Sequence, residues 1–289
     1  MSSLYTFSTG STEVYSLPSY SSVTSAQTVS EINFYSVNSV YSSTYQKIFV
    51  GPIGMSTGLT VFDSGNTATV ISISGTTFKM DIDNTNNLVV VLQEGTCCPG
   101  SVPLLIIDAF SDTILYTLDI DGYKGGIAID SNNGYCYVVG NSDLLIKVDI
   151  LNGVTADTIN IGNNGTLSKN VIYNPTNNYI YTFEPSSRIK IWDASDNSFI
   201  GDITITANTS FFIYNPDQDY IYVGNITGVT DDFVITTIRC NANTILSETF
   251  IYSGATTTNE QNIFGFYSID TQYLYVGDVE SDSILVLTT

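Results

Sequence analysis

A short Tyr-x-Tyr element recurs along the chain, and it constrains the fold more than any other feature of the sequence. Its clearest copy is Tyr179-Ile180-Tyr181, and the third positions of its seven copies are residues 5, 49, 90, 137, 181, 222 and 275. Repeat units of roughly 40 to 50 residues, each able to hold four strands, are typical of propeller blades. Seven copies in nearly even register therefore predict seven blades.

The stretch Lys169–Ile205 shows what one unit contains. Four runs rich in β-branched and aromatic residues alternate with turn sequences such as Asn-Pro-Thr-Asn-Asn and Asp-Ala-Ser-Asp-Asn. Asn, Asp, Pro and Ser favour turns because their side chains or rings satisfy or preset the local backbone. Each unit is thus expected to be four short strands joined by tight turns.

The same pattern places strands throughout the chain. First strands are expected at Ile32–Asn38, Lys79–Asp83, Gly126–Asp130, Val171–Asn174, Phe211–Asn215 and Phe264–Asp270. Third strands are expected at Leu59–Asp63, Leu104–Asp108, Leu145–Asp149 and Arg188–Asp193. Fourth strands are expected at Thr69–Ser74, Thr113–Asp119, Ala156–Ile161, Phe199–Ile205 and Ile245–Tyr252.

These units predict an all-β fold, a single seven-bladed β-propeller spanning residues 1–289. The expected blades are 1–31, 32–75, 76–121, 122–166, 167–208, 209–256 and 257–289. The first blade begins at its second strand (Leu4–Phe7) and the last ends on its third (Ser283–Thr289), so 3 + 5 × 4 + 3 gives 26 strands. Runs such as Leu88–Leu92 are continuously apolar, which predicts that neighbouring blades cover both faces of the strands. No sustained 3.6-residue period predicts a helix.

The repeat resembles the YVTN family of β-propellers. The likeness is carried by Tyr137–Gly153 (YVVGNSDLLIKVDILNG), Tyr220–Gly228 (YIYVGNITG) and Tyr273–Leu287 (YLYVGDVESDSILVL), and it extends over the whole chain, best from Lys79 onward. The resemblance implies the seven-bladed fold. Proteins of that fold include lactonases, surface-layer components, quinoprotein-like enzymes and binding platforms, so it does not select a function.

Charge excludes two classes of partner. The sequence has 28 Asp and Glu against 8 Lys and Arg, for a net charge of −20. So few cations cannot neutralise a row of phosphates, which argues against nucleic acid and anionic membrane surfaces. There is no run of 18 apolar residues, and the start shows neither the basic region nor the apolar core of a secretory signal. We expect no membrane insertion.

Catalytic chemistry is also restricted by composition. The chain has no histidine, which removes Ser-His-Asp and Cys-His catalysis and most zinc and copper sites. The four cysteines, at positions 97, 98, 136 and 240, do not repeat with the blades, so no disulfide framework is expected. We expect no enzyme activity, no catalytic residue and no cofactor.

Acidic residues recur at two places in the repeat. Third strands end in Asp63, Asp108, Asp149 and Asp193, and we expect each carboxylate to cap the turn that follows. Asp81, Asp83 and Asn84 place several oxygens close together, as calcium loops do, but the glycine and glutamate of an EF-hand are missing. Turn chemistry is the favoured interpretation, and calcium binding is the alternative.

Two segments are candidate partner contacts. Cys97, Cys98 and Pro99 lie in a hairpin longer than its sisters, with no nearby basic residue to activate a thiol. Ser283, Ile284, Leu285, Val286 and Leu287 form an uncharged apolar run that we expect to be the edge of the last sheet. Such an edge invites strand addition, and we expect a neighbouring subunit or a rearranged N-terminal strand to cover it.

The sequence favours a non-enzymatic structural and binding platform. Low charge and a surface rich in hydroxyls and amides suit a virion component, such as a capsid, turret or tail protein that contacts other structural proteins or a host surface. One alternative is a cell-surface or secreted propeller that binds carbohydrate or protein through tyrosine-rich loops. Another is a lactonase-like enzyme working through carboxylates alone.

Overall fold

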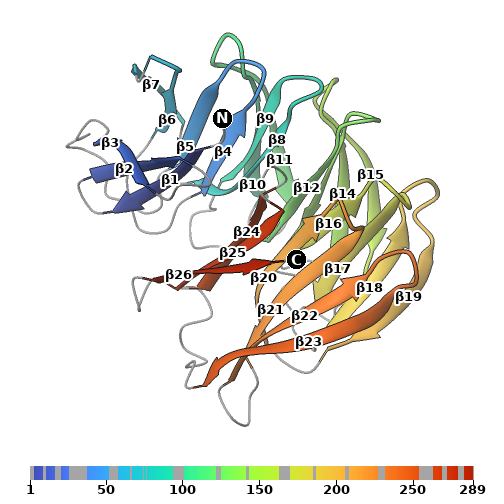
Figure 1. Ribbon diagram of the computed structural model, residues 1–289. Helices are drawn as coiled ribbons and strands as arrows, with labels where there is room; N and C mark the ends of the chain where they lie inside the picture. The colour runs from blue at the N-terminus through green and yellow to red at the C-terminus, as the bar shows by residue number, and fades with distance from the viewer. Residues whose placement is uncertain are drawn as a thin grey trace. The chain divides into compact units, whose positions relative to one another are not determined.

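The computed structural model shows a chain of strands and turns, with no helix in the described part (Figure 1). It describes residues 3–8, 11–16, 21–25, 38–51, 58–65, 67–73, 75, 77–93, 101–121, 125–140, 143–162, 170–184, 187–205, 208–226, 232–253, 263–268, 272–278 and 283–288. None of these segments forms a helix long and apolar enough to span a membrane. The chain divides into two compact units, Met1–Asn160 and Ile161–Thr289.

The first unit holds four antiparallel sheets whose strands follow one another in chain order. They are β1 (Ser3–Ser8), β2 (Ser11–Ser16) and β3 (Ser21–Ser25); β4 (Asn38–Ser42), β5 (Lys47–Gly51), β6 (Leu59–Phe62) and β7 (Ala68–Ile71); β8 (Thr77–Asp83), β9 (Leu88–Gln93), β10 (Ser101–Asp108) and β11 (Thr113–Asp121); and β12 (Ile127–Asp130), β13 (Tyr135–Val139), β14 (Leu144–Asp149) and β15 (Val154–Asn160).

The second unit holds three more antiparallel sheets, also in chain order. They are β16 (Val171–Asn174), β17 (Tyr179–Glu184), β18 (Arg188–Asp193) and β19 (Phe199–Thr204); β20 (Asn208–Asn215), β21 (Tyr220–Ile226), β22 (Asp232–Arg239) and β23 (Thr244–Ser253); and β24 (Ile263–Ser268), β25 (Tyr273–Asp278) and β26 (Ser283–Thr288).

The described strands number 26, and the sheets have three, four, four, four, four, four and three strands in chain order. Both the expected count and the expected three-stranded sheets at the two ends of the series are confirmed. Closure of the seven sheets into one propeller domain stays a prediction.

One expected strand is misplaced. The sequence predicted a first strand at Ile32–Asn38, but β4 occupies Asn38–Ser42, and residues 32–37 lie outside the described part of the chain. The reason lies at the end of the strand. The first strands β8, β12, β16 and β20 end in Asp or Asn, whereas here the Ser42 hydroxyl accepts the Tyr45 N–H at 3.4 Å. Serine is a weaker turn signal than Asp or Asn.

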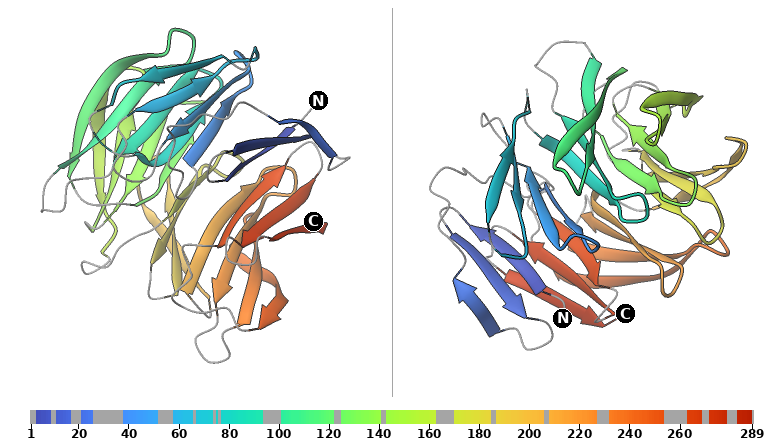
Figure 2. Two further views of the ribbon diagram at one scale, coloured as in Figure 1. Left: turned by 90° about the vertical axis from the view of Figure 1, so that its left-hand side faces the viewer. Right: turned by 90° about the horizontal axis from the view of Figure 1, so that it is seen from above.

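The hydrophobic core lies between successive sheets within each unit. Val89 and Val91 of β9 pack toward the β4–β7 sheet, while Val90 and Leu92 pack toward β12–β15. The first strands β4, β8 and β12 lie beside one another, as do β16, β20 and β24 in the second unit (Figure 2). The expected burial of both strand faces is therefore confirmed for the run Leu88–Leu92.

The third position of the repeated Tyr-x-Tyr element is buried in every copy whose side chain is described. These side chains are Phe49, Val90, Tyr137, Tyr181, Tyr222 and Tyr275. Tyrosine suits the position because its ring fills the core while its hydroxyl reaches a polar group at the sheet junction. The Tyr181 hydroxyl donates to Asn243 Oδ1 at 2.8 Å and accepts from Asn177 Nδ2 at 3.0 Å.

The fourth strands depart from the expectation that both faces are covered. Six of the seven residues of β15 are exposed, and β7 and β19 are mostly exposed as well. Most of these strands also carry a β-bulge, an extra residue with no partner on the third strand. The bulged residues are Leu115, Ala156, Ile200, Leu246 and Ile251. Fourth strands are edges of their sheets, so only one neighbour covers them.

Candidate functional site

The first-to-second-strand turns use their acidic and amide side chains for backbone capping. Asp83 Oδ1 accepts the N–H groups of Thr85 and Asn86, each at 3.0 Å, and Asp83 Oδ2 accepts Asn86 Nδ2 at 2.7 Å. Equivalent bonds are made by Asp130, Asn174 and Asn215. All four capping side chains are buried, so these inner turns are structural parts of the sheet junctions.

The three calcium candidates point to different partners. Asp83 is occupied by its own turn, and Asn84 Oδ1 accepts the Ser43 N–H at 3.0 Å and the Ser43 hydroxyl at 3.2 Å from the neighbouring sheet. Asp81 Oδ1 accepts the Ile82 N–H at 2.8 Å. Within the described residues, no three acidic or thiol side chains are grouped as a metal site requires. At this hairpin, the side chains of Asp83 and Asn84 therefore accept hydrogen bonds from turn residues.

The third-to-fourth-strand turns confirm the expected role of their aspartates. Asp149 Oδ1 accepts the N–H groups of Leu151 and Asn152, each at 3.0 Å, and Asp149 Oδ2 accepts Asn152 Nδ2 at 2.8 Å. Asp63, Asp108 and Asp193 make the same kind of contact. At Asp108, the Ser111 N–H and hydroxyl hold the carboxyl pKa below its usual range.

Asp81 is a carboxylate in an unusual environment. Burial raises its pKa to about 6, against the lowering effect of the Ile82 and Ile129 N–H groups, and the charge of Asp83 adds to the rise. Burial also raises the pKa of the Cys136 thiol nearby and lowers that of the Lys79 ammonium on the same strand. The raised pKa makes the Cys136 thiol less reactive than an exposed one, whereas the lowered pKa of Lys79 favours its neutral amine.

The other predicted contact residues divide between described and undescribed parts. Cys97, Cys98 and Pro99 lie outside the described residues. Ser283, Ile284, Leu285, Val286 and Leu287 lie on β26, which is the edge of the β24–β26 sheet as expected. Val286 is exposed, and Leu287 packs partly against the core of the second unit. The edge is therefore real, while its covering partner stays a prediction.

A second surface, which sequence reasoning missed, lies on the first unit. The β11 patch consists of exposed apolar residues on the last turn and outer strands of two neighbouring sheets: Phe110, Ile114, Leu115, Tyr116, Leu151 and Val154. The two sheets meet where the Tyr116 hydroxyl donates to the Leu151 carbonyl at 3.3 Å. Exposed apolar side chains gathered on neighbouring turns and strands are candidate interaction sites.

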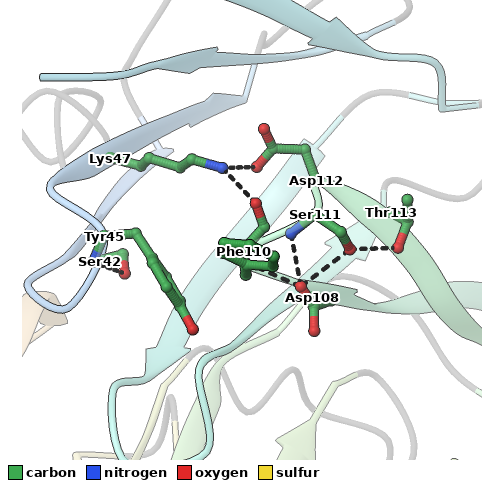
Figure 3. Close-up of polar contacts among 8 residues, drawn as sticks. All are labelled: Ser42, Tyr45, Lys47, Asp108, Phe110, Ser111, Asp112 and Thr113. Carbon is green, nitrogen blue, oxygen red and sulfur yellow. Dashed lines mark hydrogen bonds and ion pairs between the residues drawn. The ribbon is translucent and has the colours of Figure 1, made fainter. Parts of the chain in front are cut away.

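Phe110 is held outward by a well-bonded turn (Figure 3). Asp108 Oδ1 accepts the Phe110 N–H at 2.9 Å and the Ser111 N–H at 2.7 Å. Phe110 is 68% exposed, the highest value for a large apolar side chain in the described part of the chain. Its ring lies 5.3 Å from the ring of Tyr45, which comes from the adjacent β4–β5 turn.

A lysine fixes these two turns to each other. Lys47 Nζ donates to Asp112 Oδ1 and to the Phe110 carbonyl, both at 2.8 Å (Figure 3). Because both partners lie on the Asp108–Thr113 turn, Lys47 restrains that turn from the neighbouring sheet. The arrangement presents an aromatic side chain on a backbone that is already ordered, which reduces the entropy lost on binding.

Comparison with known proteins identifies the fold. No known protein family matches the chain, and no curated protein is similar to it in sequence. Among solved structures, a chain of a mitotic checkpoint complex matches with a TM-score of 0.71 over 97% of this chain and 82% of its own length, at 13% identity. A chain of Kuenenia stuttgartiensis hydrazine synthase matches with a TM-score of 0.59 over 69% of this chain, also at 13% identity.

These likenesses concern architecture. The chain is propeller-like, built of antiparallel sheets in series. It spans only 55% of the hydrazine synthase chain, and identities this low carry no function. The YVTN resemblance stays a prediction.

Proposed function

We propose that this protein is a non-enzymatic interaction platform that binds another protein through the β11 patch. The observation that carries the proposal is the exposure of Phe110, Ile114, Leu115 and Tyr116 in one continuous segment, Phe110–Tyr116, of an otherwise well-packed sheet. The propeller-like fold supports this choice by analogy alone, because one scaffold can carry many functions.

The absence of enzyme activity is part of the proposal. It is supported by the lack of histidine in the sequence and by the bonding of the turn carboxylates to their own backbone, as at Asp83 and Asp149. A lactonase-like reaction would need a carboxylate free to move a proton at the substrate. Assays on sugar lactones should therefore give the uncatalysed rate.

The partner is expected to present an apolar surface with few acidic groups. The platform has a net charge of −20, so a strongly acidic partner is repelled at low salt. Aromatic side chains such as Phe110 and Tyr116 supply large contact area for little lost rotamer entropy. They are the residues at which binding energy is expected to concentrate.

The chain contains a matched pair of sites that tests the patch. Thr113-Ile114-Leu115 on β11 and Thr244-Ile245-Leu246 on β23 have the same sequence and similar exposure. Ile114→Ser with Leu115→Ser should weaken the interaction with the partner that co-purifies from the native source at least ~tenfold, because each lost apolar contact contributes roughly 1 kcal/mol or more.

The control is the corresponding double change at Ile245 and Leu246, which removes the same side chains from another outer strand. It should leave the affinity unchanged. Equal loss in both variants, or no loss in either, would mean that the β11 patch is not the binding surface. Circular dichroism of both variants shows whether the sheets remain folded.

The finer assignment is a virion component, a capsid, turret or tail protein that contacts other structural proteins or a host surface. Its support is the low content of charged residues, 12%, and the Ser-, Thr-, Asn- and Tyr-rich composition. Purified particles should contain this chain in stoichiometric amount. Recovery of the chain only from the cell's soluble fraction would contradict the assignment.

A glycan-binding function is the second candidate, favoured by the Tyr45–Phe110 cluster. Two aromatic rings lie beside the hydroxyls of Ser111 and Thr113, which are 2.8 Å apart, and the carboxylate of Asp112. Sugars are recognised by such combinations of a flat apolar surface and hydroxyl or carboxylate groups. A glycan array should show binding that Phe110→Ala abolishes, whereas an array without signal excludes this candidate.

A further inference from the structure

The outer edge of the β24–β26 sheet differs from the outer edges of the four-stranded sheets. In each four-stranded sheet a fourth strand pairs with the third, whereas β26 (Ser283–Thr288) is a third strand that pairs, among the described strands, with β25 alone. Its register with β25 is continuous over six residues. The backbone groups on that side are therefore available to another strand.

Equivalent positions show what the missing neighbour would cover. Val286 lies opposite Tyr275, as Ile106 lies opposite Val90 and Ile191 opposite Tyr181. Ile106 and Ile191 are at most 1% exposed, but Val286 is 36% exposed. On the other face, Leu287 is only partly buried, while its counterparts Ile107, Val148 and Ile238 are fully buried.

The other outer edges are less suited to strand addition. The outer strands β3, β11, β15, β19 and β23 are bulged, and bulges disrupt the flat ladder that an added strand needs. The unbulged β7 is only four residues long. β26 combines length, continuous register and the absence of charge.

We propose that two copies of this chain pair through β26 in an antiparallel, two-fold symmetric continuous sheet. Residues that lie directly opposite one another on paired strands point to the same face of the sheet, whereas successive residues of one strand alternate between faces. In a symmetric pair, the two-fold axis must therefore pass between a residue and the same residue of the second copy. Centred on Val286, it pairs Leu285 with Leu287 of the second copy. Centred on Leu285, it pairs Ile284 with Val286.

A second copy fits this edge because the edge is self-complementary. The segment Ser283–Thr288 has no charged residue in a chain that carries 28 acidic and 8 basic side chains. Either symmetric register therefore places only uncharged residues opposite one another, and an isologous contact closes as a dimer. The inference is independent of the β11 patch, which lies on a different unit.

The test uses the oligomeric state of the full chain. Sedimentation at about 0.3 M salt, where repulsion between two acidic copies is screened, should show a monomer–dimer equilibrium. Val286→Lys should weaken the dimer at least ~tenfold, because edge lysines oppose strand addition. The added cation reduces the net negative charge of each copy, so a loss of dimer cannot arise from greater overall repulsion.

Val70→Lys is the matched control, since Val70 is an exposed valine on the other unbulged outer edge, β7. It should leave the dimer intact. Equal loss in both variants would indicate head-to-tail pairing of β26 with β7 and would overturn the symmetric dimer, as would a wild-type monomer at all concentrations. If Val286→Lys fails to fold, wild-type amide exchange decides: protection at Ile284–Val286 must rise with protein concentration, and concentration-independent exchange overturns the proposal.

Discussion

The inner and outer turns of the β8–β11, β12–β15 and β16–β19 sheets use one capping arrangement in two environments. In both, an Asp or Asn at the end of a strand caps the four-residue loop that follows, and the loop ends at a residue with positive φ, such as Asn87 in an inner turn and Gly153 in an outer one. Inner caps are buried between sheets, and outer caps face solvent or are only partly covered. The same capping hydrogen bonds are therefore expected to contribute more to stability in the inner turns than in the outer turns.

The inner turn also holds a third strand in place. The carbonyl of its positive-φ residue accepts the N–H of the residue that follows the third strand, as in Ala109 to Asn87 at 3.0 Å and Ala194 to Asn178 at 2.9 Å. In the described outer turns, the carbonyl of the positive-φ residue accepts no such bond from another strand. Loss of an inner cap should consequently disturb three strands, whereas loss of an outer cap disturbs one hairpin.

The largest effect is expected at Asp83. Asp83→Ala empties a fully buried position and removes the acceptors of three hydrogen bonds, from the Thr85 and Asn86 N–H groups and from the Asn86 amide. The free energy of unfolding should fall by about 2–4 kcal/mol, as expected for the loss of a buried group together with several hydrogen bonds. Asp83→Asn keeps one acceptor oxygen and should cost roughly 1 kcal/mol. Urea denaturation measures both, and equal losses would show that the hydrogen bonds are not the cause.

Asp81 provides a contrast to Asp83, because it is a carboxylate on the same strand that caps no turn. Its pKa of about 6 lies above the ordinary 3.8, so the folded state binds a proton more tightly than the unfolded state. Ionisation thus destabilises the fold as pH rises from about 4 to about 6, and the penalty is complete near pH 7. Asp81→Asn should stabilise the protein by about 1–3 kcal/mol at pH 7.5.

At pH 4 the same change should have a much smaller effect, since Asp81 is then protonated in the folded protein and roughly 40% protonated in the unfolded one. The difference between variant and wild type isolates Asp81 from the other carboxylates, which titrate in both proteins. Melting temperatures at the two pH values provide the measurement. A stabilisation that persists at pH 4 would assign the effect to packing instead of charge.

An outer cap should matter less. Asp149→Ala removes the acceptor for Leu151, Asn152 and the Asn152 amide, but water replaces the lost bonds at this exposed turn. We expect a loss of about 0.5–1.5 kcal/mol in unfolding free energy, in the range of a helix N-cap. Parallel urea titrations of Asp83→Ala and Asp149→Ala test the comparison directly. A loss at Asp149 as large as that at Asp83 would remove the distinction between inner and outer turns.

The sequence predicted these turns well because their chemistry is local. The residue type and spacing of Asp149 and Asp193 predict the hairpins that follow them. β16 has the predicted bounds, Val171–Asn174. It did not predict the bulges or the exposure of Leu115, because a one-residue slip depends on how the third and fourth strands pair. An Ile-Leu pair on an edge strand has the same sequence signature as one in the core.

The predicted position of β4 was wrong for a related reason. Ser42 caps its turn as Asp and Asn do elsewhere, but a serine among many serines gives no distinctive pattern. The β11 patch was likewise invisible, since Lys47 and Asp112 are 65 residues apart in sequence and meet only through the packing of two sheets. Long-range pairs of this kind have no local signal.

The smallest effect concerns the positive-φ residue that closes an inner turn. Gln46 adopts φ of 53° and is exposed, whereas the equivalent position in the β12–β13 turn is Gly134. The left-handed conformation costs a residue with a side chain roughly 1 kcal/mol, and glycine escapes this cost while losing more chain entropy on folding. Gln46→Gly should therefore stabilise the protein by about 0.5 kcal/mol, a rise of roughly 1–2 °C in melting temperature. Gly134→Ala is the opposite test: its new Cβ would lie 2.6 Å from Leu151 Cδ1, so the crowded site should lose stability on the same scale or more. If Gln46→Gly instead lowers the free energy of unfolding, other contacts at this turn already offset the cost of the left-handed conformation of Gln46.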